Sequence, residues 1–329
     1  MRALVTGGAG YIGSHMVRAL LDAKHDVVVL DDLSHGHRDA VAPEARLVEG
    51  NVGHTRDVAA LLRDERIEVV FHFAGLIRVE ESVTDPRKYF QGNLAFSLGL
   101  LDAVLEAGRP LPFVFSSTAA VYGEPVAVPI EEAHPQRPVN PYGESKLAVE
   151  RVLDAYGKAY GLPWAALRYF NAAGAHPEAH LGERHEPESH LIPIVLEVAA
   201  GTRPSVAIYG TDWPTPDGTC VRDFIHVRDL CDAHLAAIEH LREGGAAASG
   251  PMNLGTGKGH SVREVVQVVE SVTGRPIPVV EAPKRPGDPP SLVASVDRAA
   301  AVFGWKARRS DLPAIVRDAW AYKTWKTGP

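Results

Sequence analysis

The stretch VTGGAGYIGSH, residues 5–15, decides the fold. It places Gly7, Gly10 and Gly13 directly after an apolar run, RALVT, and at the start of an amphipathic segment over 12–23. Such a triplet supplies a tight turn, lets a phosphate approach bare backbone, and lets a helix pack closely on a strand. Because ordinary turns also use glycine, the triplet alone is weak evidence for a nucleotide site.

The next apolar run strengthens this interpretation. DVVVL, residues 26–30, is followed by Asp31, 18 residues after Gly13. A carboxylate at this point can accept hydrogen bonds from both ribose hydroxyls of a dinucleotide. Strand, glycine loop, helix and acid together predict a dinucleotide site rather than a plain glycine turn. Asp31 and Asp32 would repel a 2′-phosphate and no arginine follows directly, so NAD is favoured over NADP.

Further apolar runs continue the alternation of strands and helices. We expect strands at 45–50, 69–75, 113–117 and 164–170, with amphipathic or loop segments such as 55–64 between them. Runs of Val, Leu, Ile and Phe are typical of strands covered on both faces, and this spacing favours right-handed crossovers. The sequence therefore predicts an α/β protein with a Rossmann-type doubly wound parallel sheet.

The rhythm changes after residue 168, where polar and proline-containing loops follow. We expect an NAD-binding Rossmann domain over 1–168 and a smaller C-terminal α/β substrate-binding domain over 169–329, with a segment around 221–255 returning to the first domain. GGAAASG, residues 244–250, is interpreted as a short flexible connector.

Composition excludes several classes of protein. The 329 residues carry a net charge of −7 without clustered Lys and Arg, which argues against nucleic acid as a partner. No signal peptide and no run of apolar residues long enough to span a membrane is visible, so we expect a cytoplasmic protein. Cys220 and Cys231 suggest neither a disulfide framework nor a zinc site, and the 15 histidines show no metal-binding spacing, so no metal is expected.

A tyrosine and a lysine stand four residues apart in NPYGESKLAVE, residues 140–150. Asn140 can cap a helix and Pro141 suits its first position, which places Tyr142 and Lys146 on one face. The lysine charge, the helix dipole and a cationic nicotinamide nearby would each lower the tyrosine pKa toward neutrality. The same spacing also occurs by chance on many helix faces, so the pair is not decisive alone.

A neighbouring strand adds hydroxyl groups to this spot. FVFSSTAAVYG, residues 113–123, ends in Ser116, Ser117 and Thr118 at the carboxyl edge of the predicted sheet, where open α/β sheets bind ligands. A hydroxyl there could relay a proton between a substrate oxygen and Tyr142. The alternative is that these residues cap a turn.

Together these motifs resemble a known family. TGGAGYIGSH, HFAGL, SSTAAVYGE, PYGESK, LRYFNAAGAHP, GTCVRDFIHVRDL, NLGTG and RPGDPP are similar to motifs of the UDP-sugar 4-epimerases, within the extended short-chain dehydrogenase/reductases. The resemblance runs from Met1 to about Trp320. It implies an isomerase that holds NAD and reversibly inverts C4 of a UDP-hexose, UDP-galactose or UDP-glucose, through a 4-keto intermediate in galactose metabolism, usually as a homodimer.

The resemblance also implies residue roles. Tyr142 would take the proton of the 4-hydroxyl, Lys146 would hold the nicotinamide ribose, and Thr118 would relay the proton. The implied cofactor contacts, besides Tyr142 and Lys146, are Gly7, Gly10, Tyr11, Ile12, Gly13, Asp31, Asp32, Leu33, Ser34, His35, Gly36, Asn51, Val52, Phe73, Ala74, Gly75, Leu76, Asn93, Ser116 and Phe170. The implied substrate contacts, besides Thr118 and Tyr142, are Asn171, His190, Leu191, Ile208, Tyr209, Arg222, Arg285 and Asp288.

The chain departs from the family pattern at a few positions. Asn51 stands where an aspartate is common, and Ile77 and Arg78 stand where a lysine often follows FAGL. Leu292 is intermediate between the tyrosine of some members and the small residue of those that accept N-acetylated sugars. The alternative substrates are therefore a UDP-N-acetylhexosamine or a UDP-pentose.

Two rival functions are disfavoured. A nucleotide-sugar 4,6-dehydratase carries an Asp-Glu pair directly after the relay threonine, whereas Ala119 and Ala120 follow Thr118 here. A non-enzymatic NAD-sensing regulator could lose the tyrosine and lysine, yet both are present. The apolar helices expected at 93–108 and 145–161 favour a homodimer, although both faces could instead be buried within one subunit.

Overall fold

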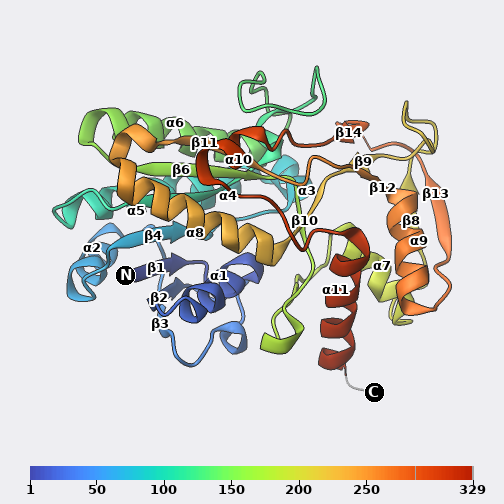
Figure 1. Ribbon diagram of the computed structural model, residues 1–329, viewed down its shortest axis with the longest axis horizontal. Helices are drawn as coiled ribbons and strands as arrows, with labels where there is room; N and C mark the ends of the chain where they lie inside the picture. Colours follow the sequence, from blue (N-terminus) through green and yellow to red (C-terminus); the bar gives the residue numbers. More distant parts are fainter. Residues whose placement is uncertain (286, 328–329) are drawn as a thin grey trace.

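The computed structural model describes residues 1–285 and 287–327 and is built around one seven-stranded sheet (Figure 1). Every neighbouring pair of strands is parallel, in the order β11-β6-β5-β4-β1-β2-β3. The strands are β1 (Arg2–Thr6), β2 (Asp26–Asp31), β3 (Arg46–Glu49), β4 (Val69–His72), β5 (Phe113–Thr118), β6 (Trp164–Tyr169) and β11 (Gly250–Leu254). The predicted doubly wound parallel sheet is confirmed.

The strand order reverses beside β1. The chain runs outward from β1 through β2 to β3, and then crosses to β4 on the other side of β1. Thr6 pairs with Leu30 of β2 and with His72 of β4, so the three strands end level with one another. Ligands of open α/β sheets bind at such a reversal, outside the carboxyl ends of the strands.

Helices cover both faces of the sheet. On one face, α1 (Tyr11–Asp22) and α8 (Val227–Gly244) pack in a core that includes Met16 and Leu230. On the other face, α2 (Thr55–Asp64), α5 (Phe96–Glu106) and α6 (Pro141–Tyr160) bury Val58, Leu100 and Leu153. Burial on both faces explains why the strands consist of continuous apolar runs.

The C-terminal half forms small sheets and its own helical core. The pairs are β10 (Phe224–His226) with β7 (Asn171–Ala173) and β13 (Val279–Ala282) with β8 (Val206–Tyr209), and a third sheet has the order β12 (His260–Ser261), β9 (Val221–Arg222), β14 (Ser291–Leu292). The helices α7 (Leu191–Ala199), α9 (Val262–Thr273) and α11 (Leu312–Thr327) stand together on the right of Figure 1 and share a separate core.

Short helices complete the chain. They are α3 (Val79–Thr84), α4 (Pro86–Tyr89), α10 (Asp297–Phe303), the 3-10 turns η1 (Arg38–Ala40), η3 (Ala119–Val121), η4 (Pro177–Ala179) and η5 (Gly245–Ala248), and the π-helical turn η2 (Phe90–Ala95). None of the helices in the described part of the chain combines the length and apolarity that a membrane span requires.

One local expectation is wrong. Residues 244–250 do not form a loose connector, because η5 spans most of them and Gly250 already belongs to β11. This segment delivers β11 to β6 at the edge of the main sheet. Cys220 and Cys231 are both free and buried.

Candidate active site

The glycine loop has the shape that a dinucleotide phosphate requires. A Cβ added to Gly7 would lie 2.5 Å from the Ala74 nitrogen, and one added to Gly13 would lie 2.1 Å from the Gly7 oxygen. These two glycines therefore allow the strand, the loop and the helix to pack closely. Gly10 differs, because its Cβ would meet only the Gly7 oxygen, at 3.3 Å, and it precedes the first turn of α1. A helix N-terminus such as this one favours a phosphate, because its first N–H groups are free to donate.

Asp31 joins β2 to the glycine loop. Its carboxylate accepts hydrogen bonds from the backbone N–H of Ala9 and of Leu33, both at 2.9 Å. Burial raises the pKa of Asp31, while the two N–H groups act in the opposite direction. The carboxylate oxygens keep further lone pairs that ribose hydroxyls could use.

The predicted adenosine-side residues follow Asp31. Asp32, Ser34 and His35 are exposed, and Leu33 adopts a left-handed conformation with φ +57°. Gly36 packs against Asp31, because an added Cβ would lie 2.8 Å from the Asp31 Oδ1. Asn51 donates from its amide to Asp32 at 3.4 Å. Val52 is buried, and Tyr11 and Ile12 are half-buried.

The segment Phe73–Leu76 leaves the sheet at the end of β4 and is held by Asn93. The Asn93 Oδ1 accepts from the Leu76 N–H at 2.7 Å, and its Nδ2 donates to the Leu76 oxygen at 3.1 Å and to Ser145 Oγ at 3.0 Å. All of these bonds are internal to the protein. Asn93 thus fixes the backbone of this segment relative to α6, which is a positioning role.

Lys146 lies buried between this segment and β5. Its Nζ donates to the Ser116 oxygen at 3.0 Å, lies 4.9 Å from the centre of the Phe115 ring, and is 3.4 Å from where a Cβ on Gly75 would be. Only 3% of Lys146 is exposed. Burial lowers the pKa of Lys146 to about 8, because the apolar surroundings disfavour its charge.

Tyr142 and Thr118 meet at the carboxyl edge of the sheet. The Thr118 hydroxyl lies close enough to the Tyr142 phenol to lower its pKa, and Thr118 Oγ1 accepts from the Ala120 N–H at 3.1 Å. Thr118 therefore takes both of the roles considered for it, capping a turn and contacting the tyrosine. In the protein without cofactor, burial raises the pKa of Tyr142, and the Thr118 hydroxyl offsets this only in part. Desolvation of the phenolate outweighs the neighbouring hydroxyl.

A buried ion pair, which the sequence pattern does not predict, lies close to these residues. Arg168 on β6 and Glu150 on α6 have side chains that are 1% and 5% exposed, and the Arg168 Nη2 lies 2.5 Å from the Glu150 Oε2. The same carboxylate accepts from Ser117, and Arg168 also donates to the Tyr122 hydroxyl at 2.8 Å. The pair ties α6 to β5 and β6 below the tyrosine.

The predicted substrate-binding residues other than Thr118 and Tyr142 lie in the C-terminal half of the chain. The Arg285 guanidinium lies 3.7 Å from the centre of the Tyr209 ring, and Arg222 Nη2 is 3.8 Å from the Asp288 carboxylate. Asn171, His190 and Leu191 are half-buried. Ile208 is only 1% exposed, so its side chain belongs to the core. Phe170 and Leu292 pack against the cluster that includes Tyr122 and Leu147.

A group of histidines and glutamates that is not apparent from the sequence also comes together. Glu183, His185, Glu188 and His190 bring one potential ligand atom each to within 4.8 Å of one another. Burial alone would lower the pKa of His185, but the carboxylates outweigh it and raise this pKa to about 9. The four residues occupy a loop, where no helical or strand periodicity reveals that they meet.

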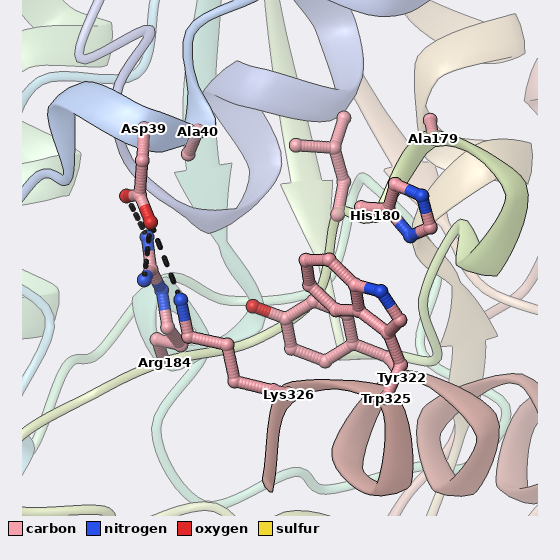
Figure 2. A pocket seen from close by; sticks show the side chains of 10 residues that line it. Asp39, Ala40, Ala179, His180, Arg184, Tyr322, Trp325 and Lys326 are labelled. Carbon is pink, nitrogen blue, oxygen red and sulfur yellow. Dashed lines mark hydrogen bonds and ion pairs between the residues drawn. The ribbon is translucent and has the colours of Figure 1, made fainter. Parts of the chain in front are cut away.

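A separate cavity of about 290 Å³ lies where α11 meets the loops around residues 40 and 180 (Figure 2). Asp39 contacts Arg184 at 3.0 Å and Lys326 at 3.3 Å, and these cations hold the pKa of Asp39 well below its usual value. The His180 ring stacks on Trp325 with centres 4.1 Å apart. None of the predicted site residues lines this cavity. We therefore interpret the cavity as a gap in the packing between α11 and the two loops.

Comparison with known proteins agrees with this geometry. Residues 3–255 match the NAD dependent epimerase/dehydratase family. UDP-glucose 4-epimerase from Azospirillum brasilense is 50% identical over 322 residues, which cover 98% of this chain and 92% of that protein.

Two solved structures are similar along their whole length. UDP-glucose 4-epimerase from Brucella ovis, in complex with NAD, superposes with a TM-score of 0.93 at 45% identity over 97% of both chains. UDP-glucose 4-epimerase from Bifidobacterium longum, in complex with NAD⁺ and UDP, superposes with a TM-score of 0.93 at 37% identity over 99% of both chains. The chain belongs to the NAD dependent epimerase/dehydratase family.

Proposed function

We propose that this protein is an NAD-dependent 4-epimerase of UDP-hexoses that interconverts UDP-galactose and UDP-glucose through a transient 4-keto sugar. The observation that carries this proposal is the grouping of Tyr142, Thr118 and Lys146. The Thr118 hydroxyl lies close enough to Tyr142 to lower its pKa, and Lys146 lies buried beside the segment that packs on the glycine loop. This grouping would place a proton acceptor, Tyr142, next to a dinucleotide site.

The cofactor would be held by the glycine loop, by Asp31 and by the segment Phe73–Leu76. NAD, when bound, supplies a hydride acceptor and donor for the sugar C4. The chain itself handles the proton: Tyr142 accepts it from the 4-hydroxyl and Thr118 relays it. With NAD bound, the positive charges of the nicotinamide and of the Lys146 ammonium would favour the phenolate and oppose the effect of burial on Tyr142.

The UDP group would be gripped by the C-terminal half. Arg222 and Arg285 present guanidinium groups that match phosphate oxygens, and Asp288 would accept from the uridine ribose. Firm anchoring of the nucleotide leaves the sugar free to turn between its two faces. Inversion at C4 requires this freedom, because the hydride leaves and returns on opposite faces of the ring.

The sugar range depends on Leu292. Its side chain packs against the cluster that contains Tyr122. A leucine here leaves more room than a tyrosine and less than a small residue, which favours hexoses over N-acetylated sugars. The ratio of kcat/KM for UDP-galactose and its N-acetyl analogue measures this preference.

A homodimer is the proposed assembly. Apolar side chains remain exposed near α3, η2 and the end of α6, where Val83 is 62%, Phe90 41% and Tyr160 54% exposed. Burial of such residues against a second copy would remove apolar surface from water. Size-exclusion chromatography with light scattering tests this, and a monomer at micromolar concentration would reject it.

The proposed function is tested by Tyr142→Phe. Loss of the hydroxyl removes the proton acceptor, so kcat should fall by about 10²–10⁴-fold. Tyr160→Phe is the matched control, because Tyr160 lies on the same helix and its side chain is exposed. Its kcat should be unchanged. Near wild-type interconversion by Tyr142→Phe would show that this residue is not the base.

A further inference from the structure

The loop between η4 and α7 gathers two glutamates and two histidines, a group we call the Glu/His cluster: Glu183, His185, Glu188 and His190. Each contributes one nitrogen or oxygen, and these atoms lie within 4.8 Å of one another. Among residues 1–285 and 287–327 this is the one group of three or more His, Cys, Asp or Glu side chains that is close enough to hold a metal ion. The proposed epimerase chemistry uses neither glutamate and leaves His185 without a role.

The spacing of the four atoms is close to that of a metal coordination shell. His190 Nδ1 lies 2.6 Å from Glu183 Oε1 and 3.4 Å from Glu188 Oε1, and His185 Nδ1 lies 3.1 Å and 3.8 Å from the same two oxygens. Ligands about 2.0–2.2 Å from a tetrahedral ion stand about 3.3–3.6 Å from each other. The observed nitrogen–oxygen distances of 2.6–3.8 Å fall on both sides of this range, so small side-chain shifts would bring the four atoms around one ion.

The histidine nitrogens are near these oxygens but do not hydrogen-bond to them. Both Nδ1 atoms are buried and lack a hydrogen-bond partner, although carboxylate oxygens lie at 2.6 Å and 3.1 Å. The nitrogens therefore do not point along the lines that join them to the oxygens. A cation between the four side chains would satisfy both nitrogens and both carboxylates together. Each glutamate side chain is only 6% exposed. Without an ion the two carboxylates are balanced by His185 and His190, whose pKa values they raise, and a bound metal ion would replace the protons of these histidines.

We propose that the Glu/His cluster binds a divalent transition-metal ion, with Zn²⁺ as the ion that its donors favour. Two imidazole nitrogens and two carboxylate oxygens form a set that Zn²⁺ accepts in tetrahedral geometry. Mg²⁺ and Ca²⁺ prefer oxygen ligands alone, so the two histidines argue against them. Four ligands from one chain make a closed site, which is typical of a structural ion.

The position of the cluster indicates what the ion would hold together. The His185 ring meets the Tyr11 ring edge-on, with centres 6.4 Å apart, and Tyr11 belongs to the glycine loop. His190 immediately precedes α7. Arg184, between two cluster members in sequence, instead pairs with Asp39, as Figure 2 shows. One ion would therefore fix the loop 183–190 between the glycine loop and the start of α7, and so position the loop rather than take part in chemistry.

Metal content of the full-length protein tests this proposal. The protein is treated with a chelator, loaded with Zn²⁺, passed through a desalting column and measured by mass spectrometry of the metal. We expect about one Zn²⁺ per chain, and a rise in the thermal unfolding midpoint when Zn²⁺ is added. Glu183→Gln and His185→Asn should weaken Zn²⁺ binding by about 100-fold or more, measured by competition with a chromogenic chelator.

His54→Asn is the matched control. His54 also lies beside a carboxylate, Asp57 at 3.8 Å, but it is exposed and outside the cluster. It should bind Zn²⁺ as wild type does. Equal metal content in all variants would mean adventitious binding, and absence of Zn²⁺ from wild type after loading would leave only an ion-pair network; either outcome overturns the proposal.

A second measurement serves if a cluster variant fails to fold. Anomalous scattering at the zinc edge, from crystals of the loaded wild-type protein, should give a peak among the four side chains. A peak elsewhere, or none, contradicts the proposal. Because metal content and scattering are independent of turnover, a failure here leaves the proposed epimerase function intact, and the reverse also holds.

Discussion

At the scale of single residues, burial decides how Tyr142 and Lys146 ionise. Burial raises the pKa of the tyrosine and lowers that of the lysine to about 8. Both shifts disfavour the charged forms that the proposed reaction uses. The free protein therefore keeps these groups in an unfavourable environment, which is common at catalytic sites.

Lys146→Met should stabilise the protein while abolishing its proposed activity. The unfolded chain keeps the lysine proton up to a pKa of 10.5, and the folded chain only up to about 8. Between these values the unfolded state binds more protons, so the free energy of unfolding rises with pH. The shift corresponds to on the order of 3 kcal/mol. The stabilisation by Lys146→Met should thus be complete below pH 8 and vanish by pH 10.5.

Urea unfolding at pH 7 and at pH 10 measures this difference. Lys158→Met is the control on the same helix, because the Lys158 side chain is 76% exposed. It should change the free energy of unfolding little at either pH. A Lys146→Met protein that is less stable than wild type at pH 7 would contradict the prediction.

Residue patterns predicted part of the site, for physical reasons. The glycines and Asp31 follow strands at fixed offsets, and helical spacing joins Tyr142 to Lys146. The Glu/His cluster lies in a loop without a period, so its proximity depends on tertiary folding. The environment of Tyr142 was also beyond prediction, since burial of a phenol depends on residues distant in sequence.

At the scale of elements, α6 is the helix that was predicted best. Asn140 accepts a hydrogen bond from the Gly143 N–H at 2.8 Å, and the helix ends at Gly161 in a left-handed conformation with φ +69°. The predicted cap is confirmed. One buried face of this helix carries both Lys146 and Glu150, which links the site to the sheet through Arg168.

Glu150→Gln should destabilise the protein strongly. It leaves the Arg168 guanidinium buried without its counter-charge, which costs roughly 3–5 kcal/mol of unfolding free energy. Asp154→Asn is the control, because it breaks the exposed pair of Asp154 with Lys158 on the same helix and should cost about 0.5 kcal/mol or less. Urea denaturation compares the two variants. Equal, small losses would show that the buried pair contributes no specific stability.

At the scale of the whole molecule, the two halves meet beside α11. The sequence predicts the parallel sheet, but the segment before its last strand, GGAAASG, is interpreted as a flexible connector because its alanines and glycines carry no strand pattern. Contacts with residues distant in sequence hold β11 in place, among them its pairing with β6 and the hydrogen bond between Asn253 and Tyr122. The packing of α11 against the loop around Gly182 likewise depends on contacts between residues distant in sequence.

Gly182→Ala should weaken this junction. An added Cβ would lie 2.2 Å from the ring of Tyr322, a buried residue of α11, so the helix must shift. Overpacking of this kind costs typically about 1–3 kcal/mol. Thermal unfolding of Gly182→Ala should show a lower midpoint than wild type. In a protein that already carries Tyr322→Ala, adding Gly182→Ala should lower the midpoint little further, because the ring that clashes is gone. Purely additive losses would argue against the clash.

The proposed epimerisation can be tested by following the hydrogen on C4. The purified protein, without added cofactor, is incubated with UDP-galactose carrying deuterium at C4, and the product is examined by NMR. A hydride that leaves and returns within one site predicts UDP-glucose with deuterium retained at C4. Product with solvent hydrogen at C4, or no product even when NAD is supplied, would contradict the proposed epimerisation.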